Sequence, residues 1–437
     1  MSESPPTPPP PDDVRMRGFA RRSTVEEAWV WLDGRVAPLA AQYVPLRESA
    51  GRVLAEAVAS RVDVPGFARA MMDGFALRAA DTLGASAYNR LALRVTGESM
   101  PGRGFAGAVG PGEAVRIMTG APLPAGADAV LPFEQAECDD GGMSASEPPH
   151  TAQRLAVQGE VAPGKHVGRV GEDVAAGAEV LPAGRRLRPQ DVGLLAAIGA
   201  AEAAVVRRPR VRIVVTGNEL LPAGSAPQPP RIVDSNGPML EALVARDGGL
   251  PDHPGIVPDE PEAILDALRS EADVVLVSGG SSVGREDHAP MLLRQHGELA
   301  VHGIAMRPSS PAGMGTLGGR LVFLLPGNPV SCLAAYDFFA GRAVRVLGGR
   351  PAGWPYRRVR MPLARKIVST VGRLDYQRVR LVGGQVEPLA IAGASILSST
   401  VRADGFAIVP PDSEGLPPGS EVEVFLYEIE GCLPAAP

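Results

Sequence analysis

The sequence contains few of the residues that hold small secreted or metal-bound domains together. Its 437 residues include three cysteines, Cys138, Cys332 and Cys432, which are far apart in the chain and form no CxxC pair. This spacing excludes a disulfide framework and a cysteine-ligated zinc site. Aromatic residues are also scarce, at 4%. A cytoplasmic location is the default expectation for such a chain.

Long apolar runs and an excess of positive charge are missing as well. No stretch reaches the roughly 18 apolar residues that a membrane-spanning helix needs, so we expect no membrane partner. The formal net charge is −6, which argues against nucleic acid as a general partner. The N-terminal MSESPPTPPPPDD has no basic-then-apolar signal pattern. Residues 1–22 are therefore predicted to be a disordered, proline-rich tail.

The chain is long enough for several domains, and 45% apolar and 21% charged residues in the full sequence are typical of a folded protein. Residues 23–60 open with helical apolar spacing, and residues 157–205 contain a predicted helix from Pro189 to about Ile198. We assign these two segments to one extended N-terminal domain. Residues 61–156 alternate short β-like runs with Gly/Pro turns, which predicts a small inserted β domain.

A strand–turn–helix pattern begins at residue 206 and continues to 348. The apolar runs VRIVV, DVVLVS and LVFLL each lead into a glycine-containing turn, and helical segments follow. Such runs predict a central parallel sheet covered by helices on both faces. Ligands bind at the carboxyl ends of the strands in such sheets, which is where all three turns lie. Residues 349–437 lose the helical period, and their short strands predict a small C-terminal β domain.

The turn SGGSSVGRED carries the sharpest chemical signal in this α/β domain. Gly279 and Gly280 allow the backbone to turn tightly and to approach a ligand. Ser278 and Ser282 add hydroxyls, and the exposed amides of such a turn suit phosphate. Asp287 ends the turn and could hold Mg²⁺ against that phosphate. A tight βα turn with a capping aspartate explains the same residues equally well.

Two other turns are predicted at the same edge of the sheet. In LPGNPVS, two prolines stiffen the chain and would present Asn328 and Ser331 at the N-terminus of a helix. In IVDSN, Asp234 stands at the start of a helix, although an N-cap role fits Ser235 or Asn236 equally well. Each turn taken alone is ordinary.

Several candidates lie outside these turns. Asp73 in RAMMDGFALR either makes a surface turn or faces a site, because an unpaired carboxylate is costly to bury. Thr119 in RIMTGAPLP and Asp173 in GED occupy comparable turns. In GIAMRPSSPAGMG, the guanidinium of Arg307 beside the hydroxyl of Ser310 would make a cradle for a small oxyanion. A surface loop with a solvated arginine is the simpler alternative.

Taken together, the motifs are specific. RAMMDGFA, RIMTGAPLP, GED, VVTGNEL, VDSN, SGGSSVGREDH, LPGNPVS and GRLDYQR follow one another over about residues 25–410. In this order they resemble the molybdopterin molybdenumtransferase family, which includes MoeA and the E domain of gephyrin. The resemblance implies a four-domain protein with an α/β domain of the molybdopterin-binding type, and a homodimer. It also implies that adenylated molybdopterin and molybdate are the substrates, that AMP is released and that Mg²⁺ is required.

The resemblance also implies roles for individual residues. The catalytic positions are Asp287, Asp234 and Asp73; the first two would bind the metal, and Asp287 would assist cleavage of the adenylyl phosphoanhydride. The implied substrate-binding residues are Thr119, Asp173, Glu202, Ser278, Gly279, Gly280, Ser282, Arg307, Ser310, Pro311, Asn328, Ser331, Arg378 and Ser395. Molybdate or a pterin-side phosphate would bind at Arg307, Ser310, Pro311, Ser331, Arg378 and Ser395.

The sequence departs from the family pattern mainly around the oxyanion. The family's KPGKP loop reads RPSSP here, so Arg307 keeps one cation and Ser310 replaces the second lysine. The family serine before MDG is Ala70, a common lysine is Pro290, and TGDEL has become TGNEL with Asn218. These changes lower the positive charge available to molybdate and leave the acidic positions intact.

Three functions follow from these observations. The first is a working molybdenumtransferase. The second is a non-catalytic relative that binds or scaffolds molybdopterin or the cofactor, which the altered loop motivates. The third is a generic nucleotide-binding α/β enzyme, such as the adenylyl transferase that acts one step earlier. The MDG, TGA and RLDYQR segments count against the third.

Overall fold

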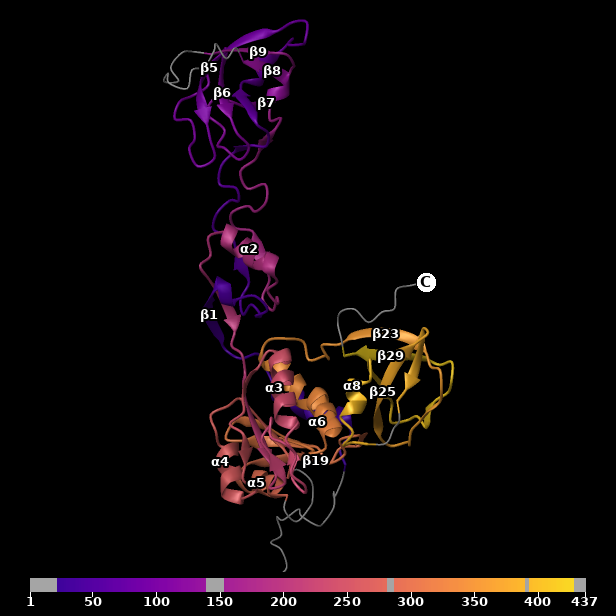
Figure 1. Ribbon diagram of the computed structural model, residues 1–437. Coiled ribbons are helices and arrows are strands. Elements are labelled where there is room, and N and C mark those ends of the chain that lie inside the picture. Colours follow the sequence, from indigo (N-terminus) through magenta and orange to yellow (C-terminus); the bar gives the residue numbers. More distant parts are fainter. Residues whose placement is uncertain (1–21, 139–152, 281–286, 390–392, 428–437) are drawn as a thin grey trace, which may run out of the picture. The chain divides into compact units, whose positions relative to one another are not determined.

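The computed structural model describes residues 22–138, 153–280, 287–389 and 393–427 (Figure 1). The candidate Ser282 and the predicted tail up to residue 21 lie outside these ranges. The chain forms two compact units, here called unit 1 (Met1–Tyr43 with Ala204–Pro437) and unit 2 (Val44–Ala203). It passes between them within β1 (Ala41–Pro45) and β12 (Glu202–Val206). Within the described ranges, no helix combines the length and apolarity that a membrane crossing requires.

A mixed seven-stranded sheet forms the centre of the α/β domain in unit 1. The strand order is β16-β13-β18-β22-β21-β19, with β17 also paired to β13. The predicted runs lie in β13, β18 and β22, which are mutually parallel. Two antiparallel strands, β21 and β19, extend one edge. The bounds are β13 (Arg210–Thr216), β16 (Leu250–Asp252), β17 (Ile256–Val257), β18 (Val274–Ser278), β19 (Glu298–His302), β21 (Gly313–Leu317) and β22 (Arg320–Leu325).

Helices cover both faces of this sheet, as the continuous apolar runs predict (Figure 1). Successive residues of a strand point to opposite faces. In β13, Ile213 therefore packs in one core with α1, α3 and the α6–α7 segment, and Val214 packs in a second core with α4 and α5. The bounds are α1 (Val25–Asp33), α3 (Asn236–Asp247), α4 (Pro261–Leu268), α5 (His288–His296), α6 (Pro329–Ala335) and α7 (Gly341–Leu347).

The apolar helix predicted after LPGNPVS contains a turn of π-helix. This segment, η4 (Tyr336–Ala340), joins α6 to α7 without a break, and all five of its residues are buried. π-turns inside α-helices are frequent at functional or strained positions. Here the turn brings Asp337 against the end of α3, where a network of buried charges has formed.

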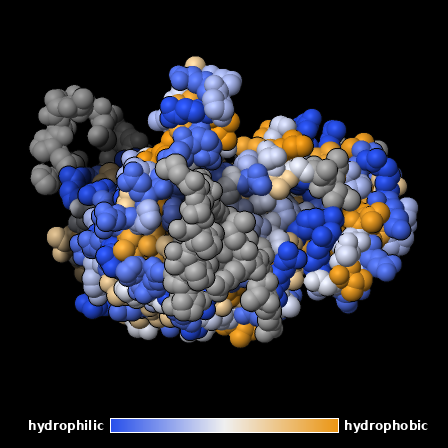
Figure 2. Space-filling view, turned by 90° about the horizontal axis from the view of Figure 1, so that it is seen from below, coloured by the Kyte–Doolittle hydropathy of each residue, from blue (hydrophilic) through white to orange (hydrophobic). Residues whose placement is uncertain are grey.

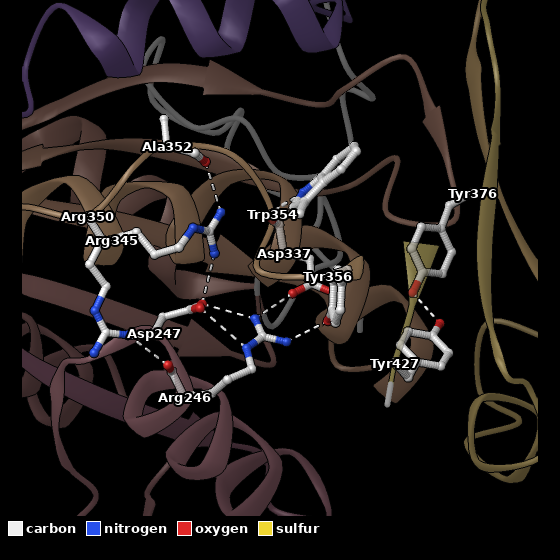
Figure 3. A network of polar contacts seen from close by, with 10 residues as sticks. All are labelled: Arg246, Asp247, Asp337, Arg345, Arg350, Ala352, Trp354, Tyr356, Tyr376 and Tyr427. Atoms are coloured by element: carbon white, nitrogen blue, oxygen red, sulfur yellow. Dashed lines mark hydrogen bonds and ion pairs between the residues drawn. The ribbon is translucent and has the colours of Figure 1, made fainter. Parts of the chain in front are cut away.

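That network connects the α/β domain to the segment leading into the C-terminal domain (Figure 3). Arg246 donates hydrogen bonds to Asp247 (2.9 Å) and Asp337 (2.8 Å), and both aspartates are fully buried. Arg345 also donates to Asp247, at 2.9 Å, and Tyr356 donates to Asp337, also at 2.9 Å. Burial raises the pKa of Asp337, and the neighbouring arginine opposes this shift.

The C-terminal β domain packs on the same unit. Its main sheet has the order β20-β25-β27-β29-β23, with β26 paired to β25. The short strand β20 comes from the RPSSP loop of the α/β domain and runs parallel to β25, with Arg307 opposite Asp375. The bounds are β20 (Met306–Arg307), β23 (Arg357–Pro362), β25 (Leu374–Val382), β26 (Gln385–Pro388), β27 (Gly405–Val409) and β29 (Glu421–Leu426).

Smaller elements complete unit 1. The helix α8 (Ser398–Val401) precedes β27 in the C-terminal domain. Two short strand pairs accompany the sheets, and they are β14 (Leu220–Leu221) with β15 (Ile232–Val233) and β24 (Ile367–Val368) with β28 (Gly415–Leu416). Figure 2 shows unit 1 from below, and hydrophilic residues interrupt the hydrophobic ones across its coloured surface.

Unit 2 is built around a six-stranded sheet with the order β7-β4-β6-β5-β9-β8. The bounds are β4 (Gly74–Leu77), β5 (Leu91–Ser99), β6 (Glu113–Ile117), β7 (Ala129–Pro132), β8 (Ala136–Cys138) and β9 (Gln153–Val157). Other elements of unit 2 include β2 (Val58–Ala59), β3 (Arg69–Ala70), β10 (Val167–Gly168), β11 (Glu179–Leu181) and α2 (Pro189–Ala197). β3 pairs with β10, and β2 pairs with β11.

Candidate functional site

Asn236 joins the start of α3 to the ends of two strands at the carboxyl edge of the α/β sheet. It is the first residue of α3, and its side-chain amide donates to Ser278 Oγ at 2.9 Å and to the Gly327 carbonyl at 2.7 Å. Ser278 ends β18, and Gly327 belongs to the turn after β22. The turns that the sequence placed at one edge are therefore connected by hydrogen bonds through a residue that we had considered only as a helix cap.

Asp234 itself caps α3. Its Oδ1 accepts hydrogen bonds from the backbone amides of Asn236 (2.9 Å) and Gly237 (3.0 Å), and the residue is 5% exposed. The N-cap that the sequence offered to Ser235 or Asn236 is thus supplied by the preceding aspartate, because the Ser235 side chain makes no capping bond. The second oxygen, Oδ2, lies beside Gly237, at 2.4 Å from where a β-carbon would stand.

The backbone after β18 requires glycine. Gly279 has a φ of +96°, and a β-carbon there would lie 2.2 Å from the Thr216 carbonyl oxygen. Gly280 also has a positive φ, +54°. After the undescribed residues 281–286, Asp287 precedes α5 and is half-buried, and its carboxylate does not cap that helix. Asp287 therefore occupies the N-cap position of α5 without a capping bond from its side chain.

Two carboxylates at this edge, Asp234 and Asp287, are the candidates to hold a divalent cation. In the portion of the chain that the structure describes, no group of three His, Cys, Asp or Glu side chains could bind a metal ion. Mg²⁺ commonly binds through one or two protein carboxylates and completes its shell with water and substrate phosphates. The donor set fits a cation held jointly by protein and substrate, and it does not fit a closed all-protein metal site.

A pocket of about 820 Å³ lies on the other side of the turn after β22, between the α/β domain and the C-terminal sheet. Four of its lining residues are arginines and none is acidic, so we name it the arginine pocket. It is lined by Arg22, residues 304–311, Pro326, Asn328, Ser331, residues 372–373, residues 376–378 and residues 393–394. Six predicted residues meet there, namely Arg307, Ser310, Pro311, Asn328, Ser331 and Arg378.

The RPSSP loop has a defined shape in this pocket. Ser309 has a φ of +85°, a conformation that glycine adopts without strain, and it donates from its hydroxyl to the Ser331 carbonyl at 2.6 Å. The Ser310 carbonyl accepts from the Ile304 amide at 2.8 Å. The Ser310 hydroxyl is buried and has no hydrogen-bond partner among the described residues. An oxyanion in the pocket would give this hydroxyl an acceptor.

Arg378 forms the wall contributed by β25. The residue is 5% exposed, and its guanidinium donates to the Ser399 hydroxyl and, at 3.5 Å, to the Gly393 carbonyl. Burial lowers the pKa of Arg378. The predicted Ser395 is exposed and does not line the pocket, although the neighbouring Ala394 does and accepts from the Val330 amide at 3.0 Å.

Two further residues of GRLDYQR belong to this region. Arg373 lines the arginine pocket, and the fully buried Asp375 lies directly behind it. The presence of both arginines of this motif had supported the resemblance, but only Arg378 was predicted as a binding residue, and Asp375 was not considered. An aspartate between two arginines in a predicted strand was the available signal, but strand pairing was needed to bring it opposite Arg307.

Unit 2 brings two of its predicted residues together. Asp73 is exposed in the turn before β4, and its Oδ1 accepts from the Thr119 amide (2.7 Å) and the Thr119 hydroxyl (2.8 Å). These two bonds lower the pKa of Asp73. Asp173 and Glu202 are both exposed, Asp173 in a separate turn and Glu202 at the start of β12. Asp73 thus makes a surface turn, one of its two predicted alternatives.

Three family models match most of the chain in order. Residues 23–199 match "MoeA N-terminal region (domain I and II)", residues 212–345 match "Probable molybdopterin binding domain", and residues 360–427 match "MoeA C-terminal region (domain IV)". These matches run through both units and include the edge of the sheet and the arginine pocket.

Named relatives and solved structures are similar over nearly the whole length. Molybdopterin molybdenumtransferase 2 of Mycobacterium tuberculosis is 35% identical over 395 residues, covering 87% of this chain and 94% of the relative. Molybdopterin molybdenumtransferase of Haemophilus influenzae is 32% identical, covering 89% and 94%. A crystal structure of the molybdopterin biosynthesis MoeA protein from Pyrococcus horikoshii OT3 has a TM-score of 0.73 at 31% identity, covering 93% of this chain and 100% of that one.

Proposed function

The chain belongs to the MoeA family of molybdopterin molybdenumtransferases and acts in molybdenum cofactor biosynthesis, and we propose that it inserts molybdate into adenylated molybdopterin and releases AMP. One observation carries the residue-level proposal. The turn after β22 has Pro326 and Asn328 in the arginine pocket, and its Gly327 carbonyl is bonded to Asn236 at the phosphate-binding edge. A ligand whose phosphate lies at the carboxyl edge could extend across that turn, so that its other end meets an oxyanion bound in the arginine pocket.

The nucleotide half of the proposed site lies at the carboxyl edge. Ser278, Gly279 and Gly280 present a hydroxyl and a tightly turned backbone that can approach a phosphate. Asp234 and Asp287 would hold Mg²⁺ together with the substrate phosphates, and the bound cation would neutralise charge on the leaving AMP. Cleavage of a phosphoanhydride depends mainly on such positioning and neutralisation.

The molybdate half of the proposed site is the arginine pocket. Arg307 and Arg378 supply planar guanidiniums that suit a tetrahedral oxyanion, and the buried Ser310 hydroxyl supplies a donor that has no partner within the described ranges. Pro311, Asn328 and Ser331 complete the wall. Ser395 is exposed and outside the pocket lining, so its assignment rests on the family resemblance alone.

The remaining parts of the proposal rest on the family. We include a homodimer and a cytoplasmic location, as well as roles for Asp73, Thr119, Asp173 and Glu202 of unit 2 in the complete site. Exposed carboxylates such as Asp73 remain charged at neutral pH and could meet a ligand or a partner subunit. Sedimentation of the purified chain would test the dimer directly.

Substituting Asp287→Ala tests the catalytic assignment. We expect AMP release from adenylated molybdopterin to fall at least a hundredfold, because the cation would lose one of its two protein ligands. Asp266→Ala is a matched control, since Asp266 lies in the neighbouring helix α4 and outside the proposed site. Equal turnover of both variants and the unmodified chain would remove Asp287 from the mechanism.

The altered RPSSP loop favours one alternative function, a non-catalytic relative that binds or scaffolds the cofactor. Ser310 stands where the resembling family has a second lysine, so a charge that would act on molybdate is absent from the loop. Calorimetric titration with adenylated molybdopterin separates the two functions. Tight binding without molybdate-dependent AMP release would favour the scaffold, and turnover would exclude it.

A further inference from the structure

Asp375 is a buried carboxylate immediately behind the arginine pocket. It lies in β25 opposite Arg307 of β20, and it is fully buried. Its Oδ2 accepts hydrogen bonds from the guanidinium of Arg307 and from the Ser369 hydroxyl, the latter at 2.7 Å. A buried carboxylate costs free energy unless charged partners and hydrogen bonds compensate for the lost water. Arg307 is therefore held in a fixed place by a group that the pocket itself does not expose.

A second arginine makes an ion pair with the other oxygen of the same carboxylate. The Nε of Arg373 lies 3.2 Å from Asp375 Oδ1, a contact without hydrogen-bond geometry, and its Nη2 donates to Thr370 Oγ1 at 3.4 Å. The side chains of Arg307 and Arg373 are each 33% exposed, and both line the arginine pocket. Asp375 thus contacts two guanidiniums that line the arginine pocket, and each guanidinium side chain remains partly exposed.

The charges of this arrangement favour an anion. One carboxylate cannot neutralise two guanidiniums, and no acidic residue lines the pocket. Two guanidiniums side by side would otherwise repel each other, and the intervening carboxylate keeps them together. An oxyanion entering the pocket would meet fixed, planar donors, which pay less conformational entropy on binding than a free arginine would.

We propose that Arg307 and Arg373, both held on the buried carboxylate of Asp375, form a two-arginine clamp for the oxyanion substrate. Arg373 then places a second cation in the arginine pocket, from the turn that precedes β25. Asp375 is a positioning residue, because it acts through the two arginines. This inference rests on the proposed function in one respect, that molybdate enters the arginine pocket.

Direct binding of molybdate to the full-length chain tests the clamp without requiring turnover. Calorimetric titration of Arg373→Ala should give a Kd for molybdate about tenfold or more above that of the unmodified chain. Arg373→Lys should lie between them, because lysine keeps the charge and loses the planar fork. Arg360→Ala is the control for loss of one positive charge, since Arg360 lies in β23 of the same domain and its side chain is 77% exposed. Equal Kd values for Arg373→Ala and Arg360→Ala would overturn the clamp.

The positioning role of Asp375 has a kinetic signature. In Asp375→Asn, the KM for molybdate should rise about tenfold or more while kcat at saturating molybdate changes less than threefold, and Asp375→Glu should recover part of the loss. A matched fall in kcat with no change in KM would contradict positioning. If Asp375→Asn does not fold, the Arg373 titrations decide the question.

The outcomes separate the clamp from the proposed function. Molybdate binding that depends on Arg373, in a chain that releases no AMP, would retain the clamp and reject the reaction. AMP release that is unaffected by Arg373→Ala would retain the reaction and reject the clamp. No molybdate binding by the unmodified chain would contradict the clamp and the assignment of the arginine pocket together.

Discussion

Ser309 holds a backbone conformation that is unusual for a residue with a side chain. Its φ of +85° lies in the left-handed region, and His166 is the only other described non-glycine residue with a positive φ. The KPGKP loop of the family that this chain resembles has glycine at the position of Ser309. The hydroxyl of Ser309 bonds to Ser331, which compensates part of the strain.

Substitutions at Ser309 should separate strain from hydrogen bonding. Ser309→Ala keeps the strained φ and loses the bond, so we expect it to lower the free energy of unfolding by about 1–2 kcal/mol. Ser309→Gly loses the bond but relieves the strain, and it should stay within about 1 kcal/mol of the unmodified chain. Urea unfolding of both variants measures the difference. Alanine no more destabilising than glycine would contradict this account of the loop.

Cys332 should be chemically inert in the folded chain. It is fully buried beside Ser278, and burial raises the pKa of its thiol to about 12. Thiolate is the reactive species, so almost none is available at pH 8. Mass-spectrometric mapping after iodoacetamide treatment should find Cys332 unmodified until denaturant is added, while the half-buried Cys138 reacts sooner. Rapid alkylation of native Cys332 would show that this region opens.

Some residues of the candidate site could be predicted from their own motifs. Others could be identified only from contacts between distant segments of the chain. Arg307, Ser310 and Ser331 were selected from their own motifs, and they meet in one pocket. Asp234 caps α3 through local bonds, and the sequence left the capping residue open. The bonds of Asn236 to Ser278 and Gly327 could not be predicted, because they depend on where the chain returns. The predicted roles of these residues remain proposals.

At the scale of elements, the buried charges around α3, η4 and α7 should stabilise the attachment of the C-terminal domain. Arg345 is 3% exposed and donates to Asp247 at the end of α3 and to the Ala352 carbonyl. Arg342, one turn away on α7, makes an ion pair with the half-exposed Asp33 instead. The same helix therefore carries a buried pair and a surface pair.

Arg345→Met should lower the free energy of unfolding by about 2–3 kcal/mol, the cost of a lost hydrogen bond between charged groups. The larger penalty of about 3–5 kcal/mol for an isolated buried charge does not apply, because Arg246 still pairs with Asp247. Arg342→Met should cost about 1 kcal/mol or less. Thermal unfolding compares the two variants, and equal losses would mean that the buried network adds no stability beyond a surface pair.

Strands with long apolar runs could be predicted from the sequence. Short strands that form only by pairing with another strand could not. The runs in β13, β18 and β22 are continuous and apolar because both faces of the sheet are covered, and all three were found where predicted. The strands β19 and β21 were not singled out, since they are short and their antiparallel pairing depends on β22. The π-turn η4 interrupts an otherwise regular apolar helical pattern, which gave no signal for it.

At the scale of the whole molecule, unit 1 and unit 2 have separate cores and should respond separately to mutation. Asp191 in α2 of unit 2 is 4% exposed and accepts hydrogen bonds from Arg188 and Arg185. The bond from Arg188, with the other arginine contacts, lowers the pKa of Asp191. A lowered pKa stabilises the folded unit above the unfolded pKa of about 4, and this contribution declines as the pH falls below that value.

Asp191→Asn should therefore destabilise unit 2 by about 2 kcal/mol at pH 7 and by less at pH 3. Hydrogen exchange followed by mass spectrometry should detect faster exchange in unit 2 and unchanged exchange in β18 of unit 1. An effect of equal size in both units would show that the two unfold together. A larger effect at pH 3 than at pH 7 would contradict the assigned charge of Asp191.

The central claim is that this chain joins molybdate to adenylated molybdopterin with loss of AMP. The most direct measurement is the amount of AMP released by the purified full-length chain from adenylated molybdopterin with Mg²⁺, with and without molybdate. The account predicts molybdate-dependent release, with one AMP for each active cofactor formed, as measured by reconstitution of a molybdoenzyme. AMP release no higher than in the protein-free control, at saturating molybdate, would contradict it.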